Sequence, residues 1–182
     1  DMGGQLQQVT ILMADIRGFT TISEHLPPQK VVKLLNNYLG TMAEIIMRHN
    51  GIVDEFIGDA ILALFGAPYT GENDAANAIR CAIAMQNEMA AVNARSRSLS
   101  LPEIRMGIGI NSGEVVAGNI GSEKRAKYGV VGHAVNVTSR VEDQTQPGEI
   151  LATASTISSA ALALDTGRRI ELQPKGLSLI HI

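Results

Sequence analysis

Three carboxylates stand inside an otherwise apolar stretch, IVDEFIGDA, at residues 52 to 60. Acids seldom interrupt a core strand, so Asp54, Glu55 and Asp59 need a structural or a chemical reason. A further acid, Asp15, ends the first apolar run, QVTILMAD. Two Asp side chains at one place repel each other unless a cation lies between them, and hard oxygen ligands suit Mg²⁺ or Mn²⁺. These residue types therefore fit divalent-cation chemistry on phosphate, provided that the fold brings Asp15 and Asp59 together.

The hydrophobic pattern predicts elements that would bring them together. Residues 8 to 15 have the composition of a buried strand, and apolar positions spaced by three and four predict a helix after Pro28 that stops at Asn50. Two further apolar runs are joined by Gly58 and Asp59, which predicts a tight hairpin.

A second helix, capped by Asn73 or Asp74, and a strand in EIRMGIGIN complete the series strand, helix, strand, strand, helix, strand. This order predicts an α+β fold with a ferredoxin-like βαββαβ core, an antiparallel sheet with helices packed on one face. The first and third strands of such a core are neighbours, so Asp15 and Asp59 should meet at one edge of the sheet.

The rest of the chain predicts a C-terminal αβ extension. We expect a polar linker at residues 95 to 100, a glycine-containing hairpin at GIGINSG, a strand near KYGVV, a helix in AVNVTSRVED, and then a strand, a helix and two strands. GIGINSG lacks the glycine spacing of a dinucleotide-binding loop. Asp54 and Glu55 are adjacent in the predicted strand, so their side chains point to opposite faces, and we expect that of Asp54 to be solvated.

Two further groups have the chemistry to bind phosphate. The amides of residues 16 to 20, a turn with Gly18 before a helical start, are suited to cradling an anion. Asn136 and Arg140 are four residues apart and share one face of a helix. Most such pairs are simply solvated; as a functional pair, Arg would donate to a phosphate and Asn to a sugar or ring oxygen.

Length and composition bound the function. The 182 residues fit one domain, residues 1 to 182, with 45% hydrophobic residues for its core. A net charge of −3 gives no bulk attraction to nucleic acid or to an anionic membrane, so we expect neither as a partner. The single Cys81 lies in an apolar helical pattern and is expected to be buried and reduced. We expect a cytoplasmic domain excised from a larger sensor or receptor protein, which could itself be membrane-attached.

Taken together, these stretches resemble the catalytic domain of class III nucleotide (adenylyl and guanylyl) cyclases. The resemblance is carried by ADIRGFT (14–20), DEFIGDAILALF (54–65), IRMGIGINSGEVVAGNIGS (104–122), YGVVGHAVNVTSR (128–140) and LQPKG (172–176). They stand in the family's order and span nearly the whole chain. The family's fold has a ferredoxin-like core, in agreement with the order of elements above.

The resemblance implies roles at the phosphate end of the substrate. Asp15 and Asp59 match the metal-binding aspartates for two Mg²⁺ or Mn²⁺ ions per site, with the carbonyl of Ile16 as a further ligand. The substrate-binding positions there are the triphosphate-cradling amides of Ile16, Arg17, Gly18, Phe19 and Thr20 and the basic residues Arg105 and Lys175.

It also implies a catalytic pair and a dimer. Asn136 and Arg140 match the residues that orient the ribose and stabilise charge on the α-phosphate. In the family each site is built from two chains: Asp15, Asp59 and Arg105 come from one, and Glu55, Gly129, Asn136, Arg140 and Lys175 from the other. One chain here carries both sets, which implies a homodimer with two equivalent sites at its interface.

Glu55 and Gly129 match the two positions that contact the purine. An ionised carboxylate only accepts, and guanine offers the N1–H and 2-amino donors side by side, whereas adenine presents a lone pair at N1. Glu55, where adenylyl cyclases usually carry Lys, therefore indicates GTP as substrate and cyclic GMP as product. Gly129 has no side chain to donate to guanine O6, so O6 would depend on another donor.

Three alternatives remain. An adenylyl cyclase with unusual base contacts is the nearest. A palm-like two-metal nucleotidyltransferase would use Asp15 and Asp59 but leave Asn136, Arg140 and Glu55 without a role. A non-catalytic nucleotide-binding module would usually lack a metal-binding Asp or the Arg, and both are present.

Overall fold

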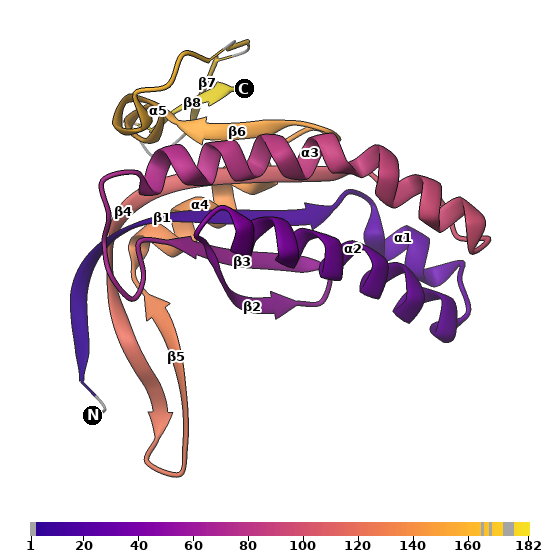
Figure 1. Cartoon of the computed structure of the whole chain (residues 1–182), viewed down its shortest axis with the longest axis horizontal. Coiled ribbons are helices and arrows are strands. Elements are labelled where there is room, and N and C mark those ends of the chain that lie inside the picture. The colour runs from indigo at the N-terminus through magenta and orange to yellow at the C-terminus, as the bar shows by residue number, and fades with distance from the viewer. Residues whose placement is uncertain (1–2, 165, 168, 173–176) are drawn as a thin grey trace.

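A single sheet runs through the computed structural model, which describes residues 3–164, 166–167, 169–172 and 177–182 (Figure 1). In chain order the elements are β1 (Gly4–Ile16), α1 (Phe19–Glu24), α2 (Pro28–Arg48), β2 (Ile52–Ile57), β3 (Ala60–Phe65), α3 (Asp74–Ser98), β4 (Met106–Ser122), β5 (Arg125–Val131), α4 (His133–Asp143), β6 (Ile150–Thr153), α5 (Ala154–Ala160), β7 (Arg169–Leu172) and β8 (Leu177–His181).

The strand order confirms the predicted core. The strands lie in the order β2-β3-β1-β4-β6-β8-β7, and β5 pairs with β4 outside this path. The first and third strands are antiparallel neighbours, with Thr10 opposite Phe65. The hairpin across Gly58 and Asp59 is present, with Ile57 opposite Ala60. The extension adds one parallel pair, β4 with β6, to an otherwise antiparallel sheet.

The two helices of the predicted core, α2 and α3, lie on one face of the sheet as predicted, and α4 of the extension covers the other face. Ile108 and Ile110 of β4 join the large core cluster formed with α2 and α3. Gly109 lies between them in sequence and so points to the other face, where it meets the backbone of α4. In Figure 1, α2 and α3 lie in front of the sheet and α4 lies behind it.

Strand β4 is continuous, so the predicted hairpin at GIGINSG is wrong. None of Gly107, Gly109 and Gly113 has a positive φ, and all three stay within the extended strand. A Cβ on Gly109 would lie 2.5 Å from the amide nitrogen of Glu142, and one on Gly113 would lie 2.8 Å from the Cβ of Ala134. These glycines therefore provide room for α4 against the sheet rather than a turn.

Helix α3 also runs further than predicted, because polar residues expected in a linker bond to α2. The Nε of Arg95 donates to the Oδ1 of Asn37 at 3.0 Å, and Asn37 Nδ2 donates to Ser96 Oγ at 3.0 Å. These contacts carry α3 to Ser98. In α2, the fully buried position is Leu34 rather than Leu35.

The second half of β4 and all of β5 form an arm that projects from the body of the molecule, with the start of β1 paired to β4 along its base (Figure 1). Val116 pairs with Val131 at its base, and Ser122 with Arg125 at its tip. Val116, Ile120 and Val131 are exposed apolar residues on it. A projecting arm with exposed apolar side chains has the character of an interaction surface.

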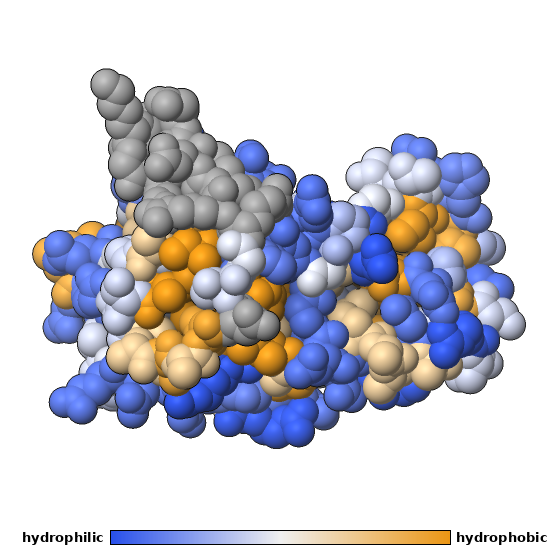
Figure 2. Space-filling view, turned by 90° about the horizontal axis from the view of Figure 1, so that it is seen from above, coloured by the Kyte–Doolittle hydropathy of each residue, from blue (hydrophilic) through white to orange (hydrophobic). Residues whose placement is uncertain are grey.

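Apolar side chains also gather beside the C-terminal segment on the face shown in Figure 2. A hollow of about 420 Å³ lies between α3 and the end of the chain, and its lining includes Ile83, Ile150, Leu164 and Ile182.

Within the described part of the chain, no helix combines the length and apolarity needed to cross a bilayer.

The close approach of α4 to β4 gives a test of the packing. Gly109→Ala should destabilise the domain by about 1–3 kcal/mol, because the new methyl group would overlap the backbone of Glu142 and α4 would have to shift. Gly40→Ala, in α2 where a Cβ meets nothing within 4 Å, should instead stabilise it by about 0.5–1 kcal/mol. Urea unfolding midpoints measure both; an unchanged midpoint for Gly109→Ala would contradict the packing described here.

Candidate active site

The two predicted metal-binding aspartates meet at one end of the sheet, as the strand order required. Asp15 is the penultimate residue of β1, and Asp59 lies in the turn between β2 and β3. The amide of Ile16 donates to the Oδ2 of Asp59 at 3.0 Å, which fixes the turn against the end of β1. Residues far apart in sequence thus place two carboxylates beside the carbonyl of Ile16.

The charge of these carboxylates is only partly compensated. The Oδ1 of Asp15 is buried without a hydrogen bond; Nη2 of Arg17 lies 3.2 Å away, but not in hydrogen-bonding geometry. Burial raises the pKa of Asp59, and the nearby Asp15 adds to this, against the Ile16 amide, which lowers it. A partly buried, under-compensated pair of hard oxygen donors fits a divalent cation.

The chain alone does not complete a coordination shell at this place. Among the described residues, no three His, Cys, Asp or Glu side chains are grouped so that they could hold a metal ion. An ion bound to Asp15 and Asp59 would need the Ile16 carbonyl, water or ligand phosphates as further partners, as is common for Mg²⁺.

Arg17 turns inward and connects β1 to α4. Its Nη2 donates to the backbone oxygen of Glu142 at 2.8 Å and forms an ion pair with the Glu142 carboxylate. Burial raises the pKa of Glu142 and the Asp15 carboxylate adds to this, whereas Arg17 opposes it. Glu142 was not among the predicted site residues, although it shares one helical face with the buried Val137, Thr138 and Val141.

The predicted phosphate-cradling turn is already partly used within the protein. The amide of Ile16 bonds to Asp59, and the amide of Arg17 donates to the Arg105 carbonyl at 2.8 Å. Gly18 adopts a left-handed conformation with φ 72, and α1 begins at the next residue. The amides of Gly18, Phe19 and Thr20 therefore remain as the candidates for an anion, and Arg105 lies beside them with its side chain exposed.

Helix α4 presents the predicted catalytic pair outward. Asn136 and Arg140 are exposed, while Val137 and Val141 are buried against the sheet. Glu142 lies two residues after Arg140, roughly 200° around the helix, and points to the Asp15–Arg17 cluster. Asn136 and Arg140 therefore point away from the carboxylates of their own chain. The last predicted residue, Lys175, lies outside the described residues.

The two predicted purine-contacting positions come together between β2 and the arm. A bulge at Asp54 separates the pairs Val53–Ala63 and Glu55–Leu62, which disturbs the alternation of side chains in β2. Asp54 is therefore only partly solvated, whereas full solvation was predicted: its Oδ1 is buried, has no hydrogen-bond partner and lies 3.5 Å from where a Cβ of Gly129 would be. Burial raises the pKa of Asp54.

Glu55 keeps an accessible carboxylate beside this place. Its Oε1 lies 3.7 Å from the Nζ of Lys127 on the arm, and both side chains are about half exposed, at 49% and 56%. Neither Asp54 nor Lys127 was predicted as a site residue. Both were missed because the bulge and the curvature of the arm are not visible in the alternation of the sequence.

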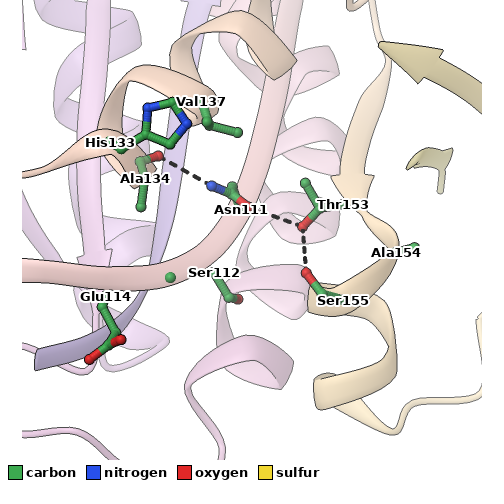
Figure 3. A pocket seen from close by; sticks show the side chains of 10 residues that line it. Asn111, Ser112, Glu114, His133, Ala134, Val137, Thr153, Ala154 and Ser155 are labelled. Atoms are coloured by element: carbon green, nitrogen blue, oxygen red, sulfur yellow. Dashed lines mark hydrogen bonds between the residues drawn. The ribbon is translucent and has the colours of Figure 1, made fainter. Parts of the chain in front are cut away.

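A separate hollow of about 420 Å³ lies between the start of α4 and the start of α5 (Figure 3). Its polar side chains bond to one another and to the backbone: Asn111 Nδ2 donates to the Ala134 carbonyl at 3.2 Å, and Thr153 Oγ1 donates to Asn111 Oδ1 at 3.2 Å. None of the predicted site residues lines it. Its hydrogen bonds join α4, β4 and β6, and so support the helix that carries Asn136 and Arg140.

Known proteins share both this fold and much of this sequence. The family model described as the adenylate and guanylate cyclase catalytic domain matches residues 3–180. The crystal structure of the guanylyl cyclase Cya2 is similar with 47% identity and a TM-score of 0.95, over 99% of this chain and 93% of that one. The structure of the adenylyl cyclase CyaB from P. aeruginosa has 32% identity and a TM-score of 0.88, over 98% of this chain and 94% of that one.

Adenylate cyclase 1 of Rhizobium meliloti (strain 1021) is 34% identical over 170 residues, which cover 93% of this chain and 25% of that enzyme. The chain thus spans a quarter of the length of that relative. The family match over nearly all residues, the similar solved structures and the two converging aspartates lead to one conclusion: the chain belongs to the family of adenylate and guanylate cyclase catalytic domains.

Proposed function

We propose that this chain is the catalytic domain of a guanylyl cyclase that converts GTP to 3′,5′-cyclic GMP and pyrophosphate, within a longer sensor or receptor protein. The observation that carries the choice of base is the accessible Glu55 carboxylate, which lies 3.7 Å from Lys127 on β5, the strand that also carries Gly129. The similarity to the guanylyl cyclase Cya2, at 47% identity, supports it. A nucleoside triphosphate substrate places the domain in the cytoplasm.

Glu55 discriminates because its carboxylate only accepts hydrogen bonds. Guanine presents N1–H and the 2-amino group as adjacent donors, and one carboxylate can accept from both. Adenine would place the N1 lone pair against the same charge, and an unmet carboxylate in a closed site costs on the order of 1–3 kcal/mol or more. The half-exposed Glu55 is free to exchange its weak surface ion pair for these bonds.

In the reaction, the ribose 3′-oxygen forms a bond to the α-phosphorus, and the bond from that phosphorus to the α,β-bridging oxygen breaks in line. The bridging oxygen leaves with pyrophosphate, and the 3′-hydroxyl proton passes to water or to Asp15. Asn136 orients the ribose, and Arg140 donates to the α-phosphate oxygens as negative charge grows on them. When bound to Asp15, Asp59 and the Ile16 carbonyl, two Mg²⁺ or Mn²⁺ ions supply charge neutralisation and a lower pKa for the hydroxyl.

The arrangement within one chain supports a homodimer. Arg17 bonds to Glu142 on the inner side of α4, so Asn136 and Arg140 face outward, away from Asp15 and Asp59 of the same chain. A second copy would bring its own aspartates to that outward face, and by symmetry would form two sites. The exposed apolar side chains of the arm supply surface for such an interface.

An adenylyl cyclase is the second candidate, and Asp54 is the observation that favours it. Its unpartnered carboxylate oxygen lies beside Gly129, where an acceptor for the adenine 6-amino group would be needed. Relatives named as adenylate cyclases accompany the guanylyl cyclase among the matches. A regulatory, non-catalytic module is weaker, because the aspartates and Arg140 are all present.

The choice of base can be measured directly. Turnover with GTP and with ATP, each with Mg²⁺ and then Mn²⁺, should show cyclic GMP formation with kcat/KM at least about tenfold above that for cyclic AMP, because only guanine satisfies Glu55. Glu55→Lys should reverse or abolish this preference. A wild-type preference for ATP would establish the second candidate, and no cyclic product from either nucleotide would contradict both cyclase assignments and favour the regulatory module.

The metal role of Asp59 has a conservative test. Asp59→Asn keeps an acceptor for the Ile16 amide but removes the charge, so turnover should fall by about a hundredfold or more with an unchanged unfolding midpoint. Glu72→Gln, in an exposed loop, is the matched control and should leave turnover as it is. Full activity of Asp59→Asn with either metal would contradict the assignment.

Sharing of sites between chains predicts complementation. Asp59→Asn and Arg140→Ala should each be inactive as homodimers, because every site then lacks one group. An equal mixture should recover about a quarter of wild-type activity, since about half of the dimers are mixed and each has one intact site of two. If subunits exchange, as shown by light scattering of tagged chains, and activity does not return, the sites are not shared.

A further inference from the structure

Lys127 lies where the base of the substrate would bind. Its ammonium is 3.7 Å from the Glu55 carboxylate, and its charge lowers the pKa of Asp54 against the stronger effect of burial. Lys127 and Gly129 are two residues apart in β5 and therefore lie on the same face of that strand. One cation thus stands among two carboxylates and a glycine at the purine-contacting position.

Guanine O6 needs a hydrogen-bond donor close to Glu55, and Gly129 has no side chain to provide one. The guanine edge carries the acceptor O6 directly beside N1–H, so a donor must stand beside the carboxylate that accepts from N1–H. Ionised Glu55 and Asp54 only accept. Among the side chains that the structure brings to this place, the Lys127 ammonium is the donor, and it already lies next to the Glu55 oxygen.

We propose that Lys127 is a specificity-determining residue of this cyclase, whose ammonium donates to guanine O6 in place of the side chain that Gly129 lacks. The inference rests on the proposed function. Glu55 then selects for N1–H and the 2-amino group, and Lys127 selects for O6. Adenine is rejected at both points, because its 6-amino hydrogens face an ammonium and its N1 lone pair faces a carboxylate.

The ion pair between Glu55 and Lys127 can readily be replaced by hydrogen bonds to guanine. Both side chains are about half exposed, so the pair contributes little to stability and opens at small cost. Once guanine is bound, both charged groups have hydrogen-bond partners: Glu55 accepts from two base donors, and Lys127 donates to O6 while its charge still acts on Asp54. Before binding, the same pair keeps the two opposite charges compensated.

The test compares GTP with 6-thio-GTP, which keeps N1–H and the 2-amino group but replaces O6 with a weakly accepting sulfur. The wild-type 182-residue chain should show kcat/KM about tenfold higher for GTP. In Lys127→Ala the GTP value should fall by about tenfold and the 6-thio-GTP value should stay, so that their ratio approaches one. Lys127→Arg should retain part of the ratio, and Lys124→Ala, at the tip of the arm, should retain all of it.

Each other outcome has a definite meaning. A Lys127→Ala chain that loses GTP and 6-thio-GTP activity equally would show that Lys127 only supports Glu55 or the arm, and this inference would be wrong while the guanylyl cyclase assignment stood. A wild-type chain with no preference for O6 over sulfur would also overturn it. A wild type that prefers ATP to GTP would overturn the proposed function first, and this inference with it.

Discussion

The ion-paired guanidinium of Arg17, whose side chain is 22% exposed, is the contact on which the arrangement of the site depends. It lies 3.2 Å from Asp15 at the end of β1 and bonds to both the carboxylate and the backbone oxygen of Glu142 in α4. A charge removed from water must be paired, so β1 and α4 cannot separate without leaving carboxylates or a guanidinium uncompensated. This pairing fixes the rotation of α4 about its axis. The outward direction of Asn136 and Arg140 follows from the inward direction of Glu142.

The glycines of β4 make that contact possible. A side chain at Gly109 would occupy the space of the Glu142 backbone, and one at Gly113 would meet Ala134, so α4 lies closer to the sheet than a strand with side chains would permit. The close approach brings Glu142 within reach of Arg17. The two halves of the chemistry are therefore held rigidly on one chain but face different directions, which is the geometry of a site completed by a second copy.

Much of this was predictable from the sequence, and the failures have a common cause. The strand order and the meeting of Asp15 and Asp59 follow from hydrophobic periodicity, which is a local property. GIGINSG was misinterpreted because glycine suits both a turn and a close approach, and only the distant α4 decides between them. Asp54 was misassigned because alternation along a strand fails at a bulge, and the bulge leaves no mark in the apolar pattern. Lys127 meets Glu55 only through the curvature of the arm.

The residues proposed to select the base and those proposed to act at phosphorus occupy different kinds of structure. Asp15 lies near the end of the central strand β1, and Asp59 lies in the β2–β3 turn that the Ile16 amide bonds to that strand. Glu55 and Lys127 lie on an edge strand and a projecting arm, half exposed and joined by a weak ion pair. Changing them alters which purine edge is satisfied without unpairing a buried charge. Under the proposed assignment, the choice of nucleotide would change at this edge while the groups proposed to act at phosphorus stay as they are, in a family that includes both adenylate and guanylate cyclases.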